Sequence, residues 1–168
     1  KNYKDETSAF IEEIQRNSAS IDLLVLSDYD KGALTDPKAL IAAANEVGVS
    51  TIVDPKGNDF TKYAGAHVLK PNASEARSGF GIPNCTEHVY ITKIQEFRKK
   101  HNIENIIVTS GSEGIFLFND MENGTQFYQE KIEVTDVTGA GDTVCAGIAI
   151  GLSVGFSINQ CCELGNLL

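Results

Sequence analysis

Residues 21–54, "IDLLVLSDYDKGALTDPKALIAAANEVGVSTIVD", hold two apolar runs with a helix-like stretch between them. The run at 21–27 is apolar except at Asp22 and Ser27, as in a strand buried on both faces, and the run at 50–54 reads as the next strand. The stretch at 37–48 opens with a proline behind Asp36 as N-cap and closes with a glycine, so it predicts a helix. Strand, helix and strand in this order predict two parallel strands joined by a crossover helix.

The rest of the chain repeats this alternation. Only a short helical stripe, Phe10 to Ile14, precedes the first strand. Further strands are expected at 66–70 and 105–110, a hairpin from 114–120 and 125–134, and helices at 72–81, 87–102, 141–152 and from about Ser157. This rhythm predicts an α/β fold with three layers, αβα, around a mostly parallel sheet. Ligands of such folds bind beyond the carboxyl ends of the strands, where "SDYDKG", "DPKG", "KPNASE" and "TSGSEG" lie.

Composition narrows the function classes. The 168 residues are 42% apolar and 22% charged, which predicts a single globular domain over residues 1–168. A net charge of −9 disfavours a nucleic-acid partner. No apolar run approaches the roughly 18–20 residues of a membrane span, and the polar start has no signal-peptide pattern. Four cysteines without a C-x-x-C pair indicate reduced thiols. We therefore expect a cytoplasmic protein without a membrane partner.

Residues 136–147, "DVTGAGDTVCAG", combine a glycine turn with two acids. Glycines let a ligand approach the backbone, and the first N–H groups of a following helix are unpaired and partly positive. Together they form an anion site, at which Asp142 would accept a proton from a hydroxyl attacking phosphorus. Taken alone, an acid behind a glycine turn is more often a plain helix start whose dipole favours the acid.

The longer string "DVTGAGDTVCAGIA" resembles the second signature of the ribokinase-like (carbohydrate kinase) family. The resemblance implies that Asp142 is the catalytic base. It also implies that Gly139, Ala140 and Gly141 form an anion hole for the transferred phosphoryl group.

Two further segments resemble motifs of this family. In "KPNASE", Asn72 and Glu75 have the N-x-x-E spacing, which implies that Asn72 contacts the nucleotide and that Glu75 orders water bound to Mg²⁺. Read alone, this spacing is usually a helix cap. "VTSGSEG" resembles the nucleotide-binding turn, in which Ser110, Gly111 and Gly114 would approach ATP, although an isolated G-x-x-G is usually only a turn.

Four more residues are weaker candidates. Lys56 in "DPKG" is expected near the phosphates, with a solvated loop lysine as the alternative. Asp28 and Lys31 in "SDYDKG" could approach the nucleotide or the sugar, and Asp28 could equally be a structural turn acid. "ELGNLL" matches the family's A-N-x-A-A stretch, which implies that Asn166 lies on the adenine side.

The "SDYDKG" and "DPKG" stretches are most similar to the heptose-7-phosphate kinases of this family. The resemblance implies phosphoryl transfer from Mg–ATP to a hydroxyl of heptose 7-phosphate, a step toward the lipopolysaccharide core. Another ribokinase-like sugar or nucleoside kinase is an alternative within the same class, and a non-catalytic nucleotide-binding fragment is one from another class. A dinucleotide-binding oxidoreductase is disfavoured because no G-x-G-x-x-G follows the first strand.

Chains of this family normally begin well upstream, with sugar-binding residues and a β lid. The resemblance therefore implies that residues 1–168 are the nucleotide-binding, C-terminal part of a kinase domain, incomplete at both ends. A parallel sheet without its first strands has an exposed apolar edge. We therefore expect the isolated chain to associate through this edge, for instance as a homodimer, or to be only marginally stable. We expect it to bind ATP weakly and not to phosphorylate a sugar.

Overall fold

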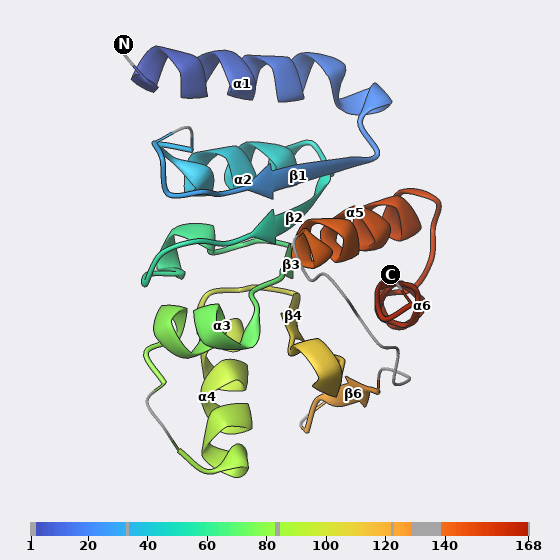
Figure 1. The fold of residues 1–168 in the computed structure, drawn as a ribbon. Helices are drawn as coiled ribbons and strands as arrows, with labels where there is room; N and C mark the ends of the chain where they lie inside the picture. Colours follow the sequence, from blue (N-terminus) through green and yellow to red (C-terminus); the bar gives the residue numbers. More distant parts are fainter. Residues whose placement is uncertain (1–2, 33, 83–84, 122, 129–138, 168) are drawn as a thin grey trace.

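A computed structural model describes residues 3–32, 34–82, 85–121, 123–128 and 139–167. Within these residues, six strands form one sheet in the order in which they occur along the chain (Figure 1). The strands are β1 (Leu23–Ser27), β2 (Ser50–Asp54), β3 (Val68–Leu69), β4 (Asn105–Thr109), β5 (Ile115–Phe118) and β6 (Thr125–Phe127). β1 to β4 are parallel, and β5 and β6 continue the sheet as antiparallel strands.

Helices cover both faces of this sheet, which confirms the three-layer α/β fold (Figure 1). One face carries α1 (Tyr3–Asn17), α2 (Pro37–Glu46), α3 (Ala73–Gly79) and α4 (Glu87–Lys100). The other face carries α5 (Ala140–Ser153) and α6 (Ile158–Gly165). Three single 3₁₀ turns complete the described structure: η1 (Ser18–Ser20), η2 (Thr61–Tyr63) and η3 (Gly111–Glu113). No described helix has both the length and the apolar character to cross a membrane.

The β1–α2–β2 unit forms as its sequence predicts. The carboxylate of Asp36 accepts a hydrogen bond of 3.0 Å from the Ala39 N–H, and Pro37 occupies the first turn of α2. This cap satisfies one of the free amides of the helix start. Leu40 and Ile41 then bury against the sheet, and β1 and β2 pair in parallel.

The central strands are rich in apolar residues because both of their faces are buried. Because successive side chains point to opposite faces, each strand contributes to both hydrophobic clusters. Val53, Leu69 and Ile106 face the α1–α4 layer, whereas Ile52, Val68 and Ile107 face α5 and α6. All six side chains are fully buried.

β1 differs from the other parallel strands because it lies at the edge of the sheet. Leu26 is buried toward α2, but Val25, on the other face, is 45% exposed. The expected burial of residues 21–27 on both faces therefore holds only in part. On that face, α5 contacts β1 and Leu23 packs against the α5–α6 cluster, so the face is covered at Leu23 and open at Val25.

Three element boundaries differ from expectation. α1 is much longer than the stripe at 10–14, because Ile11 and Ile14 pack into the core and Arg16 pairs with Glu12 and Glu13 on the exposed side. β3 is only two residues long. β6 is described up to 127, and the remainder of the expected hairpin strand lies outside the described residues.

Candidate active site

The N-terminus of α5 is an open helix end at the carboxyl edge of the parallel strands. Gly139 is its N-cap with a left-handed φ of 82°, and its carbonyl accepts hydrogen bonds from the backbone and hydroxyl of Thr143. Among the described residues, no side chain caps this helix. The amides of Ala140, Gly141 and Asp142 therefore have no partner within the helix, and all three residues are exposed. This end of α5 can receive an anion.

Packing within the protein does not require a glycine at position 141. Its backbone is helical rather than left-handed. A Cβ added there would meet only the Nζ of Lys70, 4.0 Å away, which is an ordinary contact. By contrast, a Cβ on Gly79 would lie 2.3 Å from the Phe60 ring. The bare backbone at Gly141 thus leaves space on the ligand side of the helix.

Lys70 is the functional candidate that sequence reasoning missed. It follows β3 directly, its side chain is only 2% exposed, and its Nζ lies 2.9 Å from Oδ1 of Asp54 at the end of β2. Burial raises the pKa of Asp54 above its ordinary value, although the Lys70 ammonium opposes this, and the charges of Glu75 and Asp142 raise it further. The sequence feature that could have identified Lys70 is its place directly after a buried strand, at the start of "KPNASE".

Lys56, Asn72 and Glu75 form one connected group. The Asn72 side chain accepts from the Glu75 N–H at 2.9 Å, and the Glu75 carboxylate accepts from the Asn72 N–H at 3.0 Å, which is a capping box at the start of α3. The other Glu75 oxygen pairs with Lys56 Nζ at 2.8 Å. This hydrogen bond and the charge of Glu75 raise the pKa of Lys56. Lys56 is therefore paired rather than a free loop lysine.

The turn after β4 lies beside this group. Asn72 forms an isolated parallel bridge with Thr109, which directly precedes the turn. Within the turn, the Ser110 N–H donates to the Gly114 carbonyl at 2.9 Å, and the Gly114 N–H donates to the Gly111 carbonyl at 3.0 Å. Gly114 is buried and its backbone groups close the turn, whereas Gly111 is exposed.

Asn166 is bonded elsewhere than in these groups. The side-chain amide of Asn166 donates to the Tyr128 carbonyl at 2.6 Å and so ties the end of α6 to the residue after β6. Asp136 and Thr138, which open the signature, lie outside the described residues.

The contacts of Asp28 are hydrogen bonds within the protein, which gives it a structural role. Its buried carboxylate accepts hydrogen bonds from the Tyr63 hydroxyl at 2.7 Å, from Lys62 Nζ at 2.8 Å and from the Asp30 N–H at 2.8 Å. Burial acts to raise the pKa of Asp28, but these hydrogen bonds outweigh it and lower the pKa. Lys31, by contrast, is exposed beside Lys56 on the wall of an open groove.

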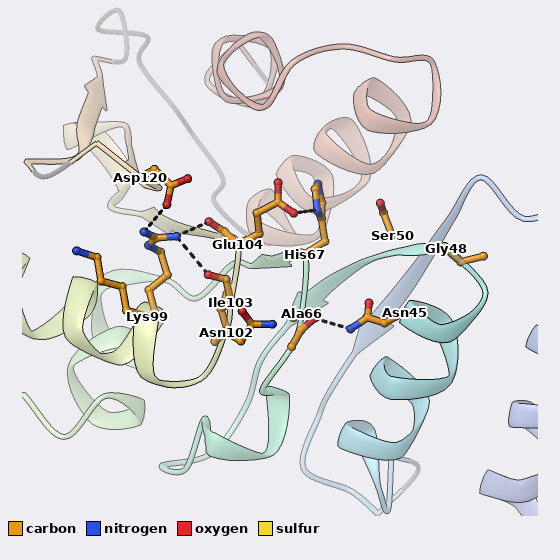
Figure 2. Close-up of a pocket in the computed structure, with 13 residues that line it drawn as sticks. Asn45, Gly48, Ser50, Ala66, His67, Lys99, Asn102, Ile103, Glu104 and Asp120 are labelled. Carbon is orange, nitrogen blue, oxygen red and sulfur yellow. Dashed lines mark hydrogen bonds and ion pairs between the residues drawn. The ribbon is translucent and has the colours of Figure 1, made fainter.

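A cavity of about 610 Å³ lies at the opposite edge of the sheet, where β2, β3 and β4 begin (Figure 2). Apart from the exposed Lys99, its charged groups bond to one another or to the backbone. His67 Nδ1 lies 2.7 Å from a Glu104 oxygen, Arg98 pairs with Asp120 at 2.9 Å, and the Asn45 amide donates to a backbone carbonyl. Because His67, Glu104, Arg98 and Asp120 are paired within the cavity, we assign it a structural role and place the chemistry at the other edge.

The donor set at the candidate site suits a metal that arrives with a nucleotide. The described residues contain no cluster of three or more His, Cys, Asp or Glu side chains that could hold an ion alone. Mg²⁺ typically uses one or two carboxylates, water and substrate phosphates. Glu75 and Asp54 are carboxylates near enough for Glu75 to affect the pKa of Asp54, so the residues present fit such an ion.

Comparisons with known proteins agree with this geometry. The family model described as "pfkB family carbohydrate kinase" matches residues 2–168. The bifunctional protein HldE of Shewanella denitrificans is 42% identical over 147 residues, with 88% of this chain and 31% of the relative covered. HldE of Aeromonas salmonicida is 35% identical over 161 residues, with 96% and 34% covered. The chain thus spans about a third of the length of these relatives.

Solved structures show the same fold. Arabidopsis thaliana ribokinase, in complex with ribose and ATP, aligns with a TM-score of 0.72 at 24% identity over 86% of this chain and 47% of its own. Escherichia coli phosphofructokinase-2, in complex with substrates and products, gives a TM-score of 0.74 at 20% identity over 92% of this chain and 53% of its own. The family match over nearly every residue shows that this chain belongs to the pfkB family of carbohydrate kinases.

Proposed function

We propose that residues 1–168 form the nucleotide-binding part of a sugar kinase domain, which transfers the γ-phosphoryl group of ATP to a hydroxyl of a sugar phosphate. The observation that carries this proposal is the start of α5, which no described side chain caps and where Gly141 leaves its backbone bare beside the buried ammonium of Lys70. A free helix N-terminus beside a buried cation favours a polyphosphate.

Asp142 has the position and exposure of a general base. In the proposed step, the sugar hydroxyl oxygen forms a bond to the γ-phosphorus, and the bond from that phosphorus to the ADP oxygen breaks. Asp142 accepts the hydroxyl proton. The turn Gly139, Ala140 and Gly141 would form the anion hole, in which the amides of Ala140, Gly141 and Asp142 stabilise the charge on the transferred group.

The remaining candidates bind the nucleotide. Lys56 and Lys70 supply positive charge from two sides, and Lys70 also holds Asp54 in place. Asn72 and Ser110 begin neighbouring segments at the same edge of the sheet. Gly111 and Asn166 are proposed as further nucleotide contacts, and Gly114 as the residue that closes the turn.

Glu75, together with Asp54, would hold Mg²⁺ through water. When bound, Mg²⁺ would neutralise part of the phosphate charge. Glu75 already bonds to Lys56 and to the Asn72 amide, so its carboxylate is fixed before any ligand arrives.

Heptose 7-phosphate is the acceptor that we favour, and the product would be the 1,7-bisphosphate for lipopolysaccharide core synthesis in the cytoplasm. Support comes from the "SDYDKG" and "DPKG" stretches and from relatives named HldE at 35–42% identity. Another sugar or nucleoside kinase remains the alternative within the same class.

The test is ADP release coupled to NADH oxidation, measured on the full product of the gene with ATP, Mg²⁺ and heptose 7-phosphate. Fructose 6-phosphate, ribose and adenosine serve as competing acceptors. We expect turnover that depends on heptose 7-phosphate and is lost in Asp142→Asn. If another acceptor is preferred, that acceptor replaces heptose 7-phosphate as the assigned substrate. ATP binding without any sugar-dependent turnover would favour a non-catalytic nucleotide-binding role.

A further inference from the structure

The hydroxyl of Tyr63 joins two loops that end neighbouring parallel strands. Tyr63 lies in η2 and its side chain is fully buried. Its hydroxyl donates to Oδ2 of Asp28, after β1, at 2.7 Å. It also accepts from the backbone N–H of Lys56, after β2, at 3.2 Å. These two loops are the "SDYDKG" and "DPKG" stretches.

Asp28 is a fixed acceptor for this hydroxyl. The carboxylate is 5% exposed and also receives Lys62 Nζ and the Asp30 N–H, each at 2.8 Å. A buried carboxylate with three donors has little freedom to move. The position of the Tyr63 hydroxyl is therefore set from the β1 side.

Both the backbone and the ammonium of Lys56 have bonding partners. Its backbone carbonyl, like its N–H, lies 3.2 Å from the Tyr63 hydroxyl oxygen. Its ammonium lies 2.8 Å from Glu75. The chain turns away directly afterwards at Gly57, whose φ is 89°. Lys56 thus stands on the wall of an open groove of about 590 Å³ with both its backbone and its charge in fixed places.

We propose that Tyr63 is a positioning residue for the kinase reaction: its hydroxyl, anchored on Asp28, fixes the backbone of Lys56 so that the ammonium meets the nucleotide phosphates from a set place. The inference rests on the proposed function. The physical reason is entropic, since a lysine residue that is free to move loses conformational freedom when it is ordered on a ligand. A fixed backbone removes part of that ordering from the binding step.

Tyr63→Phe deletes the hydroxyl and keeps the ring. Because Lys56 would bind the phosphates equally in the ground and transition states, we expect the KM for ATP to rise by about 3- to 10-fold, the effect of one net hydrogen bond. We expect kcat to stay within about twofold. A merely structural role would lower the thermal midpoint and the amount of active protein and leave KM unchanged.

A double-mutant cycle on the full product of the gene tests whether Tyr63 acts through Lys56. Lys56→Ala should raise the KM for ATP, and adding Tyr63→Phe to it should change KM by less than about twofold. Additive effects on KM would overturn the proposal. Tyr90→Phe is the matched control, because Tyr90 is a partly buried tyrosine on α4 whose ring stacks on Arg77. If Tyr63→Phe does not fold, Asp28→Asn replaces it in the cycle.

A second measurement needs no turnover. Calorimetry follows the binding of Mg–ATP to the same variants without a sugar. In Tyr63→Phe we expect the Kd for ATP to rise by the same factor, about 3- to 10-fold, and in Tyr90→Phe to stay unchanged. An unchanged Kd in Tyr63→Phe would refute the positioning role. Absence of turnover in the wild-type protein would instead count against the proposed function and leave this measurement valid.

Discussion

Two helices, α3 and α5, begin at the same edge of the sheet and complete their first turns in different ways. At α3, Asn72 and Glu75 satisfy each other's backbone amides in a capping box. At α5, the N-cap is Gly139, and no side chain in the described part of the chain caps the helix. A capped helix start contributes stability by itself, whereas an uncapped one leaves donors for something outside the chain. The difference separates a structural helix start from a ligand-binding one.

The largest expected effect is at the open helix start. Asp142→Asn keeps the size and hydrogen bonding of the side chain but removes the base. We expect turnover of the full gene product to fall about 10²- to 10⁴-fold with little change in ATP affinity. Steady-state kinetics and calorimetry measure the two quantities, and near-normal turnover would remove Asp142 from the catalytic role.

The next effect concerns the buried pair beside α5. Lys70→Met leaves Asp54 without its partner, and we expect a loss of about 3 kcal/mol in the free energy of unfolding. Chemical denaturation measures it, and Lys70→Met combined with Asp54→Asn should recover part of the loss.

The pH dependence of the Lys70→Met variant gives a second check. The pKa of Asp54 is already raised by burial and should rise further without the ammonium. A folded-state pKa above the unfolded value favours the protonated folded form, so stability is gained as the pH falls through that pKa and lost as the pH rises. If Lys70→Met lowered the free energy of unfolding equally at pH 4 and at pH 8, this account would be contradicted.

A smaller effect is expected for Gly141→Ala, which probes space rather than chemistry. A Cβ at this position meets only Lys70 Nζ at 4.0 Å, so the thermal midpoint should stay the same or rise slightly, because alanine favours a helix. If the ligand approaches this backbone, the affinity for Mg–ATP should fall by about 10-fold, or ~1.4 kcal/mol. Unchanged affinity in calorimetry would show that the phosphates bind elsewhere.

The smallest effect is at the capped helix start. Asn72→Ala removes the side-chain acceptor of the Glu75 N–H, and we expect about 1 kcal/mol less stability, as for other N-caps. Denaturation of Asn72→Ala and Asn72→Asp separates the two roles, because aspartate keeps the cap but adds a negative charge. A loss of ATP affinity in Asn72→Asp with unchanged stability would identify Asn72 as a ligand contact as well.

Glu75→Gln sharpens the same comparison. Glutamine can keep the capping box, so stability should change by less than about 0.5 kcal/mol. The ion pair with Lys56 and the proposed contact with Mg²⁺-bound water are both lost. We expect Mg²⁺ to support turnover less well in this variant. Raised Mg²⁺ should recover part of the activity. Lower stability with unchanged Mg²⁺ dependence would assign Glu75 to the cap alone.

The sequence by itself determined the order of the elements, the parallel sheet and the family signature. These features are local: apolar runs of strand length, Asp36 before Pro37, and the glycines at 139 and 141 each act through their own neighbours in the chain. The first helix was underestimated because most of its length is polar, and its stability depends on the packing of Ile11 and Ile14 into the core.

Only the tertiary structure decided which charges meet. Lys70 and Asp54 are sixteen residues apart in the sequence and Asp28 and Tyr63 thirty-five, and no local pattern links either pair. Parallel pairing brings the ends of β1, β2 and β3 to one edge, where burial turns an ordinary lysine into a fixed charge and a core tyrosine into a link between two loops. A charge that is screened in water acts strongly once it is buried with a partner, and burial is a property of the whole fold.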